Sequence, residues 1–340
     1  MNPKQPPVKS FLLIVVALMT SFWAGTASAR CTINSAGLSI SPLTASTGTS
    51  TPASAPTPQA ATFTISGTYD TNNSAGTCRV GIAFNRASLP ATMARSGGGA
   101  TLPYVITSSS GGGASLIYQG GGNPNSGNIL TSAFSSAGRR LNNWPFSTTV
   151  TAYFQQQPSS PQRAGSYGDA ITLNIYDVRG NGQVTYLTGR GFSVTGSVAM
   201  SCTIGGTSNP SSANATIPVN TSGTVNTAPI PRSFSNVVCN SFSVLQMSSL
   251  AGAVRRSTAA PTGFTNIINY AAVATYAGAS SSLNTATIPT ANGMETGSSG
   301  TTSSSTPTGT LSVTITPQSP SQPLISGNYN DTLRITITPQ

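Results

Sequence analysis

Apolar and polar residues alternate with a period of two in short runs along the chain. Clear examples are Phe63-Thr-Ile65, Val150-Thr-Ala152 and Leu311-Ser-Val313-Thr-Ile315. Such alternation places the apolar side chains on one face of a strand, and Gly, Ser, Asn and Pro residues that favour turns separate the runs. No run shows the capped, 3.6-residue apolar period of an amphipathic helix. The pattern predicts an all-β protein built from antiparallel strands.

The pattern occurs twice. A Gly-x-Tyr-x-Asp turn at Gly165–Asp169 leads into alternating apolar residues, and so does a second such turn, 162 residues later, at Gly327–Asp331. Cys78 and Cys239 are 161 residues apart. The duplication predicts two tandem immunoglobulin-like β-sandwiches. We place the first, N-terminal one at residues 30–198 and the second at residues 199–340.

Two further correspondences support the duplication. Each of the later cysteines opens an apolar stretch, which contains Val80, Ile82 and Phe84 in the first copy and Phe242, Val244 and Met247 in the second. A weaker match relates Leu102 and Tyr104 to Ile268 and Tyr270. Three stretches rich in Ser, Thr and Gly, at residues 42–60, 107–128 and 279–309, are expected to be loops.

The two copies differ after their repeated strand. The first copy continues through a turn signal, Gly180-Asn-Gly182, into residues that alternate from Phe192 to Met200 and can complete its sandwich. The second copy shows no such continuation after Leu333, Ile335 and Ile337. We therefore expect the second sandwich to be incomplete, lacking its last strand. These three residues would then form an acceptor edge for a strand donated by another chain, since an unpaired edge invites aggregation.

The N-terminus predicts an exported protein. Lys4 and Lys9 precede an apolar run, and Ala27-Ser28-Ala29 fits a cleavage site, so residues 1–29 are expected to be a signal peptide. Of the three pairings open to four cysteines, pairing within each copy gives the disulfides Cys31–Cys78 and Cys202–Cys239. Cys31 is the second residue of the expected mature chain, which leaves no N-terminal strand to donate. Subunits that each donate a strand to the next can assemble into a fibre. A subunit that can only receive a strand would occupy the distal end of such a fibre.

Composition argues against catalysis. Only 6% of the 340 residues are charged, and the chain has no His, no Lys after Lys9 and five acidic residues. No catalytic pair, metal-ligand cluster or phosphate-binding loop stands out, so we expect no enzyme activity, no cofactor and no metal. The net charge is +10, but only Arg139-Arg140 and Arg255-Arg256 are adjacent pairs, without interleaved aromatic residues. Nucleic acid is therefore not an expected partner.

The paired cysteines, the Leu102/Tyr104 and Ile268/Tyr270 strands and the two Gly-x-Tyr-x-Asp strands resemble the spore coat protein U domain family. That family includes the pilins of archaic (Csu-type) chaperone-usher pili. The resemblance implies a periplasmic pilus chaperone, an outer-membrane usher and an adjacent pilin subunit as partners. The two-copy arrangement is similar to that of tip adhesin subunits, which implies a place at the pilus tip on the cell surface. It also implies attachment to an abiotic or host surface and biofilm formation, through hydrophobic loops of the first domain.

Three segments combine apolar side chains with turn-forming residues and are candidates for those loops. The candidate surface-binding residues are Leu89, Pro90, Met93, Ile129, Leu130, Phe134, Trp144 and Phe146. Each could instead be a core residue, and for Trp144 we favour the core because a lone Trp near a strand is usually buried in a sandwich. Tyr167 and Tyr329 are expected to fix the repeated turn through hydroxyl bonds to the backbone, with Asp169 and Asp331 bracing it.

Two other functions fit the same sequence. One is a self-contained secreted coat or matrix protein of the spore coat U family, which would be stable without a chaperone. The other is a sugar-binding module, whose adhesion free glycan would inhibit. The fibre adhesin is the interpretation that accounts for the missing strand.

Overall fold

The computed structural model describes residues 31–33, 38–41, 44–50, 59–71, 78–108, 113–131, 142–154, 162–180, 182–205, 211–287 and 294–340. These ranges contain strands and two single 3-10 turns, η2 (Ser126–Asn128) and η3 (Thr285–Thr287), so the all-β prediction is confirmed. Within them, no helix has the length and apolar character needed to cross a membrane. The expected signal peptide, residues 1–29, lies outside the described ranges.

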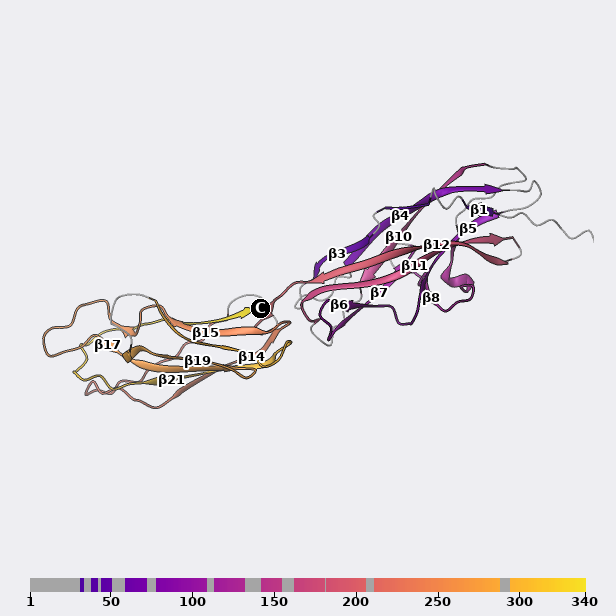
Figure 1. Cartoon of the computed structure of the whole chain (residues 1–340). Coiled ribbons are helices and arrows are strands. Elements are labelled where there is room, and N and C mark those ends of the chain that lie inside the picture. The colour runs from indigo at the N-terminus through magenta and orange to yellow at the C-terminus, as the bar shows by residue number, and fades with distance from the viewer. Residues whose placement is uncertain are drawn as a thin grey trace, which may run out of the picture.

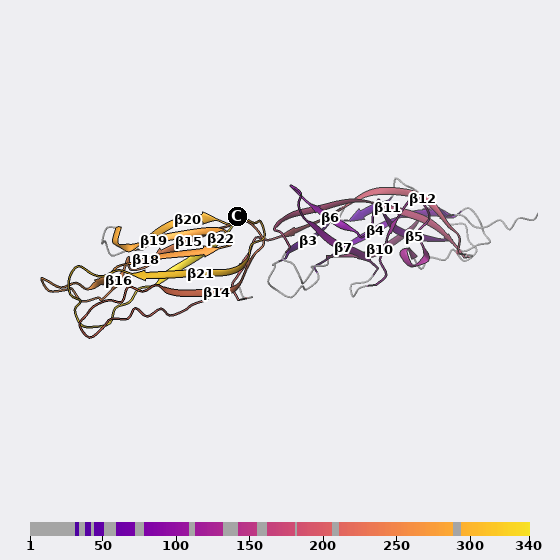
Figure 2. The same cartoon turned by 90° about the horizontal axis from the view of Figure 1, so that it is seen from below.

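The chain forms two elongated β-sandwiches joined end to end (Figures 1 and 2). The strands of the first are β1 (Cys31–Ile33), β2 (Ser39–Ser41), β3 (Thr44–Ser50), β4 (Gln59–Thr71), β5 (Cys78–Arg86), β6 (Thr92–Arg95), β7 (Thr101–Thr107), β8 (Ile117–Gln119), β9 (Leu130–Thr131), β10 (Trp144–Phe154), β11 (Gly165–Arg179) and β12 (Val184–Val198). Those of the second are β13 (Cys202–Thr203), β14 (Ile230–Cys239), β15 (Ser243–Ser249), β16 (Val254–Arg255), β17 (Ile267–Ile268), β18 (Tyr270–Tyr276), β19 (Ala279–Asn284), β20 (Glu295–Thr301), β21 (Thr308–Pro317) and β22 (Leu333–Pro339).

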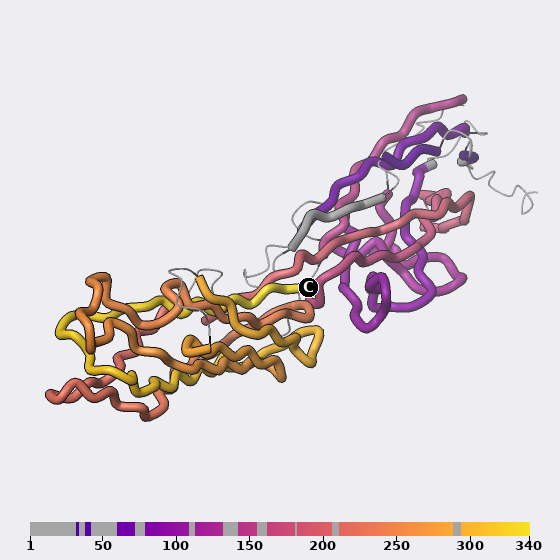
Figure 3. Tube along the Cα trace, turned by 60° about the vertical axis from the view of Figure 1, so that its left-hand side comes forward, coloured from indigo at the N-terminus to yellow at the C-terminus, as the bar shows by residue number. Residues whose placement is uncertain are grey.

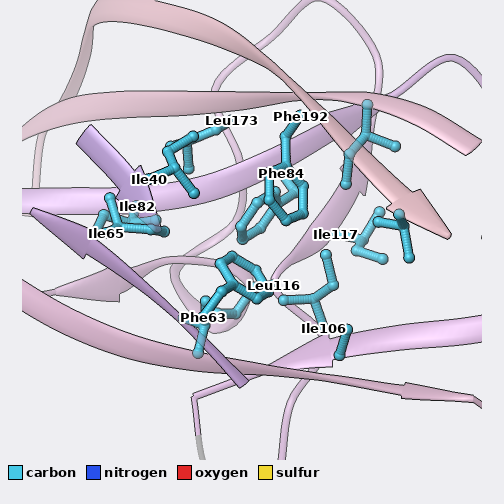
Figure 4. Close-up of a cluster of buried hydrophobic side chains, with 14 of the residues drawn as sticks. Ile40, Phe63, Ile65, Ile82, Phe84, Ile106, Leu116, Ile117, Leu173 and Phe192 are labelled. Carbon is cyan, nitrogen blue, oxygen red and sulfur yellow. The ribbon is translucent and has the colours of Figure 1, made fainter. Parts of the chain in front are cut away.

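In the first sandwich, one layer contains β4, β10 and β7, and the other contains β5, β11, β12 and β3. The pairing of β6 with β7 links the layers. An aromatic cluster fills the space between them, since Phe63 of β4 stacks on Phe192 of β12 at 4.5 Å and meets Phe84 of β5 edge-on at 5.9 Å (Figure 4). The alternating apolar residues of the sequence therefore build this core, as their period of two predicts.

The predicted closing strand of the first copy is present. β12 pairs antiparallel with β11 from Val184 to Val198, and β3 adds in parallel to its other side. β11, the repeated strand, thus lies between β12 and β5. Its inward residues Ile171, Leu173 and Ile175 are 4%, 0% and 0% exposed.

The second sandwich has one layer with the order β13-β14-β21-β18-β19 and another with the order β20-β15-β22. Its core includes Leu245, Met247, Tyr270, Leu311 and Val313. The predicted Cys202–Cys239 disulfide is present and joins β13 to β14, where the two cysteines pair directly. The side chains of Cys31 and Cys78 lie outside the described residues, so the Cys31–Cys78 bridge stays a prediction.

The buried face of β15 is formed by Leu245 and Met247, whereas Phe242 is 40% exposed and Val244 is only half-buried. Of the three apolar residues named after Cys239, only Met247 is therefore buried. One local expectation was wrong. The Ser/Thr/Gly-rich stretches are not only loops, because they contain β3, β8, β19 and β20.

Close packing explains the small residues of β20. A side chain at Gly297 would meet the carbonyl oxygen of Ser282 in β19, and one at Gly300 would meet that of Ser280. Only glycine allows the two backbones to approach so closely. Gly297 and Gly300 thus reflect close packing of β20 against β19.

The repeated turn is built in the same way in both copies. The Tyr167 hydroxyl donates to the carbonyl oxygen of Arg163 at 2.5 Å, and the Tyr329 hydroxyl donates to that of Ile325 at 2.7 Å. Each tyrosine thus closes a corner four residues long, as expected. The glycines that open the two turns, Gly165 and Gly327, have φ of 139° and 148°, a region that residues with a side chain rarely adopt.

The aspartates of the repeat brace the sandwich from inside. The Tyr104 hydroxyl donates to Asp169 at 2.7 Å, and the Tyr270 hydroxyl donates to Asp331 at 2.6 Å. Burial raises the pKa of both tyrosines well above the usual 10, so the hydroxyls stay protonated donors. Asp169 also accepts from Arg86 Nε at 2.6 Å, whereas Asp331 accepts from the Ser249 hydroxyl at the same distance.

Asn240 bonds across the junction between the sandwiches through both its side chain and its backbone. Asn240 donates from Nδ2 to the carbonyl oxygen of Ala199 at 2.6 Å and accepts from Ser201 N at 2.8 Å through Oδ1. Its own carbonyl oxygen accepts from Ala164 N, in the first sandwich, at 2.8 Å. The C-terminal end of β22 lies close to this junction (Figure 3). The connecting residues are therefore bound to both sandwiches.

The Tyr104–Asp169 bond gives a stability prediction. Tyr104→Phe leaves a part-buried carboxylate with one donor fewer, so we expect the first sandwich to lose about 1–3 kcal/mol of unfolding free energy. Trp144 is the only tryptophan in residues 30–340, so in a chain that begins at residue 30 its fluorescence in urea follows this sandwich. Tyr186→Phe, at a ring that is 53% exposed, is the control and should change stability little. Equal unfolding curves for Tyr104→Phe and the unchanged protein would contradict the bracing role.

Candidate functional site

The last strand of the second sandwich has a single neighbour. β22 pairs antiparallel with β15 from Leu333 to Pro339, and β15 continues the layer to β20 on its far side. Within the ranges that the structure describes, no strand pairs with the other side of β22. We call this side the open edge, defined by Leu333, Ile335 and Ile337. Its backbone N–H and C=O groups point away from β15, so they are available to a further strand.

The open edge leaves part of the core uncovered. Leu333, Ile335 and Ile337 pack against the buried cluster of the second sandwich but remain half-buried. The corresponding residues of the first sandwich, Ile171, Leu173 and Ile175, are almost completely buried. The residue types are nearly the same, but β11 has strands on both sides and β22 has one. A missing neighbour therefore accounts for the difference in exposure.

Other side chains at the margin of this core are also incompletely covered. Phe234 of β14, Ile315 of β21 and Ile204, next to β13, pack against the same cluster and are half-buried. They come from the layer that faces β15 and β22. Both layers thus contribute apolar side chains that solvent still reaches.

The open edge is held in place by hydrogen bonds at both ends of β22. Asp331, two residues before the strand, accepts from the Ser249 hydroxyl and from Ala251 N at 2.6 and 2.9 Å. At the other end, Gln340 N donates to the carbonyl oxygen of Phe242 at 2.7 Å. β22 is therefore fixed against β15 at both of its ends.

The first candidate loop exposes two of its three residues. Leu89 is 48% exposed and Pro90 is exposed, in the turn between β5 and β6. Met93 is 0% exposed, which corrects its choice as a surface-binding residue. It lies opposite Leu102 where β6 pairs with β7, so its side chain belongs to the core.

The second candidate segment is anchored rather than exposed. Leu130 of β9 lies opposite Ile82 of β5 and packs against the main core. Ile129 packs against a small cluster that includes Tyr118 and Tyr176. Both are half-buried, which corrects the expectation of an exposed tip. Phe134 lies outside the described residues.

In the third segment the expectations are reversed. Trp144, interpreted as a core residue, is 46% exposed at the start of β10, whereas the candidate binding residue Phe146 is 2% exposed. The two share one face of β10, but Trp144 lies at the strand end, opposite Tyr69 of β4. Figure 1 places this end of β4, beside β1, at the pole of the first sandwich away from the second. Leu89 and Pro90 follow β5 on another part of the surface, so the structure does not gather the exposed candidates into one patch.

Sequence comparisons identify no relative. No model of a known protein family matches the chain, and no curated protein matches it. Membership of the spore coat protein U domain family, suggested by the motifs, therefore stays a prediction.

Comparison with solved structures finds chains from bacterial fibres. A chain of the CsuC–CsuE chaperone–tip subunit pre-assembly complex from the archaic chaperone-usher Csu pili of Acinetobacter baumannii matches with 12% identity and a TM-score of 0.36, over 91% of this chain and 99% of that one. The CupB6 tip adhesin of Pseudomonas aeruginosa matches with 10% identity and a TM-score of 0.33, over 91% and 94%. The CssB subunit of enterotoxigenic Escherichia coli, complemented with a donor strand from CssA, matches with 18% identity and a TM-score of 0.28, over 49% and 99%. With identities and scores this low, no functional inference rests on them.

The unequal pairing of β11 and β22 predicts unequal hydrogen exchange. Amides of β22 that face the open edge should exchange fast, while those that face β15 and those of β11 should be protected, because only the former lack a backbone acceptor. Exchange followed by NMR on the mature full chain resolves the two sides of β22. Uniform protection along β22 would show that its free side is already paired.

Proposed function

We propose that this protein is an adhesin subunit of a chaperone-usher pilus, in which β22 accepts a strand from a partner chain. The observation that carries the proposal is the contrast between Ile171, Leu173 and Ile175, which are buried, and Leu333, Ile335 and Ile337, which are half-buried on the same repeated strand. A periplasmic chaperone would supply the strand first and an adjacent pilin subunit would replace it in the fibre.

Covering the open edge offers a clear free-energy gain. Complete burial of a Leu or Ile side chain contributes about 1.5–3 kcal/mol relative to full exposure, so completing three half-buried side chains contributes a few kcal/mol. The partner also pairs the free N–H and C=O groups of β22, which otherwise promote edge-to-edge aggregation. A subunit with this edge is therefore most stable in complex with a partner.

The first sandwich supplies a template for the donated strand. There, Phe192 of β12 lies opposite Ile171, and Val194 and Val198 follow at spacings of two and six residues, with Gly196 between them. All four are buried. A donor for β22 should therefore present apolar side chains at alternate positions, with room for a small residue among them.

The first sandwich is the proposed surface-binding domain at the pilus tip. Its repeated strand is covered on both sides by strands of the same chain, so it needs no donor there. Leu89, Pro90 and Trp144 are exposed on it and would contact an abiotic or host surface in attachment and biofilm formation. A place at the pilus tip would require export through the periplasm and secretion by an outer-membrane usher.

A peptide with the sequence of residues 190–199, which include the inward residues of β12, tests the acceptor role on the mature full chain. Binding at the open edge should slow trypsin cleavage after Arg334, an exposed residue of β22. It should also raise the melting temperature of the second sandwich by about 5 °C or more. Cleavage after Arg179, in the first sandwich, should not change.

Two variants locate the effect. Ile335→Asp puts a charge on the inward face of the open edge and should abolish the protection of Arg334, whereas Thr336→Asp, on the outward face of the same strand, should retain it. Unaltered Trp144 fluorescence shows that the first sandwich is intact in both. If the peptide protects neither Arg334 nor the fold, and the chain is stable as a monomer without it, the acceptor role fails and the self-contained coat protein is favoured.

The surface-binding role has its own test. Leu89→Asp and Trp144→Asp should each weaken adsorption of the protein to polystyrene beads by about 1–2 kcal/mol, because each removes an exposed apolar contact. Ser147→Asp, at an exposed polar position of β10, is the matched control for the added charge. Equal adsorption of all three variants and the unchanged protein would contradict a role for these side chains.

A further inference from the structure

The outer face of β11 carries a polar pocket that the strand-acceptor role does not use. Asn174 and Tyr176 alternate with the core residues Leu173 and Ile175, so they project from the opposite face of the sheet. They are nevertheless only 6% and 1% exposed, because Tyr118 of β8, itself 7% exposed, lies against them. Polar groups buried on an outer sheet face need an explanation.

These three side chains form a hydrogen-bonded cluster. Asn174 Nδ2 donates to the Tyr118 hydroxyl at 2.7 Å and to the Tyr176 hydroxyl at 3.2 Å. The two hydroxyls are 2.5 Å apart and share one further bond. Burial raises the pKa of Tyr176, so its hydroxyl remains protonated.

The cluster has one donor and one acceptor to spare. Two hydroxyl hydrogens are present and the bond between Tyr118 and Tyr176 uses one of them, which leaves the other for an acceptor outside the cluster. Asn174 Oδ1 accepts no hydrogen bond from the residues that the structure describes. A complementary ligand must therefore offer an acceptor and a donor close together.

A pocket of about 310 Å³ lies at this cluster, and none of its nine lining residues is charged. Tyr186 of β12 forms one wall. Its ring is 53% exposed and meets that of Tyr176 edge-on at 6.0 Å. Another wall is formed by Gly121, Gly122 and Asn123. Asn123 Nδ2 holds this segment next to β12 by donating to the carbonyl oxygen of Val184 at 2.8 Å. The volume lies at the small end of the range for ligand pockets.

Gly189 keeps one side of the pocket clear. A Cβ at this position would lie 2.7 Å from Asn174 Oδ1 and 2.9 Å from the Tyr186 hydroxyl. Glycine therefore leaves the spare acceptor unobstructed. An alanine here would crowd the cluster while changing no hydrogen-bonding group.

We propose that this pocket binds a neutral sugar ring. Neighbouring hydroxyls of a sugar act together as donor and acceptor, which matches the spare hydroxyl of the tyrosine pair and Asn174 Oδ1. The exposed ring of Tyr186 offers a flat apolar face to the C–H side of the sugar. The uncharged lining fits a neutral ligand better than an acidic one, because a buried carboxylate would have no cationic partner there. The pocket lies wholly in the first sandwich and does not rest on strand acceptance at β22.

The test uses saturation-transfer NMR on the mature full chain with methyl glycosides of glucose, galactose, mannose and N-acetylglucosamine as probes. At least one should bind in the millimolar range expected for a single ring in a small open pocket. Tyr186→Ala should weaken that binding about fivefold or more through the lost ring face. Gly189→Ala should remove it by crowding Asn174.

Phe264→Ala is the matched control, since Phe264 is 46% exposed and lies in the second sandwich, and it should leave glycoside binding unchanged. Unaltered Trp144 fluorescence verifies the fold of the first sandwich in Tyr186→Ala and Gly189→Ala. Binding by none of the four probes, or binding that survives both Tyr186→Ala and Gly189→Ala, would overturn the proposal. These outcomes are independent of peptide protection at Arg334 and of adsorption to polystyrene, so this site and the fibre role can fail separately.

Discussion

Backbone pairing on both sides of one repeated strand is the constraint on which this structure depends. β11 and β22 carry similar residues and occupy the same place in their sandwiches. β11 is held between β5 and β12, and its inward side chains are excluded from solvent. β22 has β15 alone, and the same kind of side chain stays half-exposed. Apolar residues on a strand are therefore buried by neighbouring strands as well as by the facing layer.

The repeated turn shows how the strand is positioned whether or not it is fully paired. Tyr167 and Tyr329 close their corners by the same bond to the backbone four residues earlier. Asp169 and Asp331 receive the same bond from Tyr104 and Tyr270. None of these contacts involves the neighbour that β22 lacks. The second sandwich thus holds β22 in register without that neighbour, so the proposed partner strand would bind a pre-formed edge and order less of the chain.

Alternation and repetition predicted the strands and the duplicated turn. They did not predict burial or contacts that depend on residues far apart in the sequence. The period of two gave the strand faces and the offset of 162 residues gave the duplicated turn, because both are local signals. Burial depth along a strand is not local: Trp144 and Phe146 share a face, yet the strand end exposes one and the core buries the other. The glycine-rich β20 was missed because its glycines are required by the close approach of the β19 backbone, which a local sequence pattern does not show. The Asn174 cluster was missed because Tyr118, far away in sequence, completes it.

The closing strand next to the repeated strand has different consequences in the two sandwiches. In the first, β12 covers the core with Phe192 and Val194 and, nearer its start, places Tyr186 and Gly189 beside Asn174 on the outer face. A strand supplied by the same chain can carry side chains matched to a pocket, because its sequence is fixed together with that of β11. In the second copy, a strand supplied by another chain in the proposed fibre would have to be released and replaced during assembly. A permanent strand would therefore make the first sandwich the better place for a shaped binding site, and an exchangeable strand would make the second the better place for a joint between subunits.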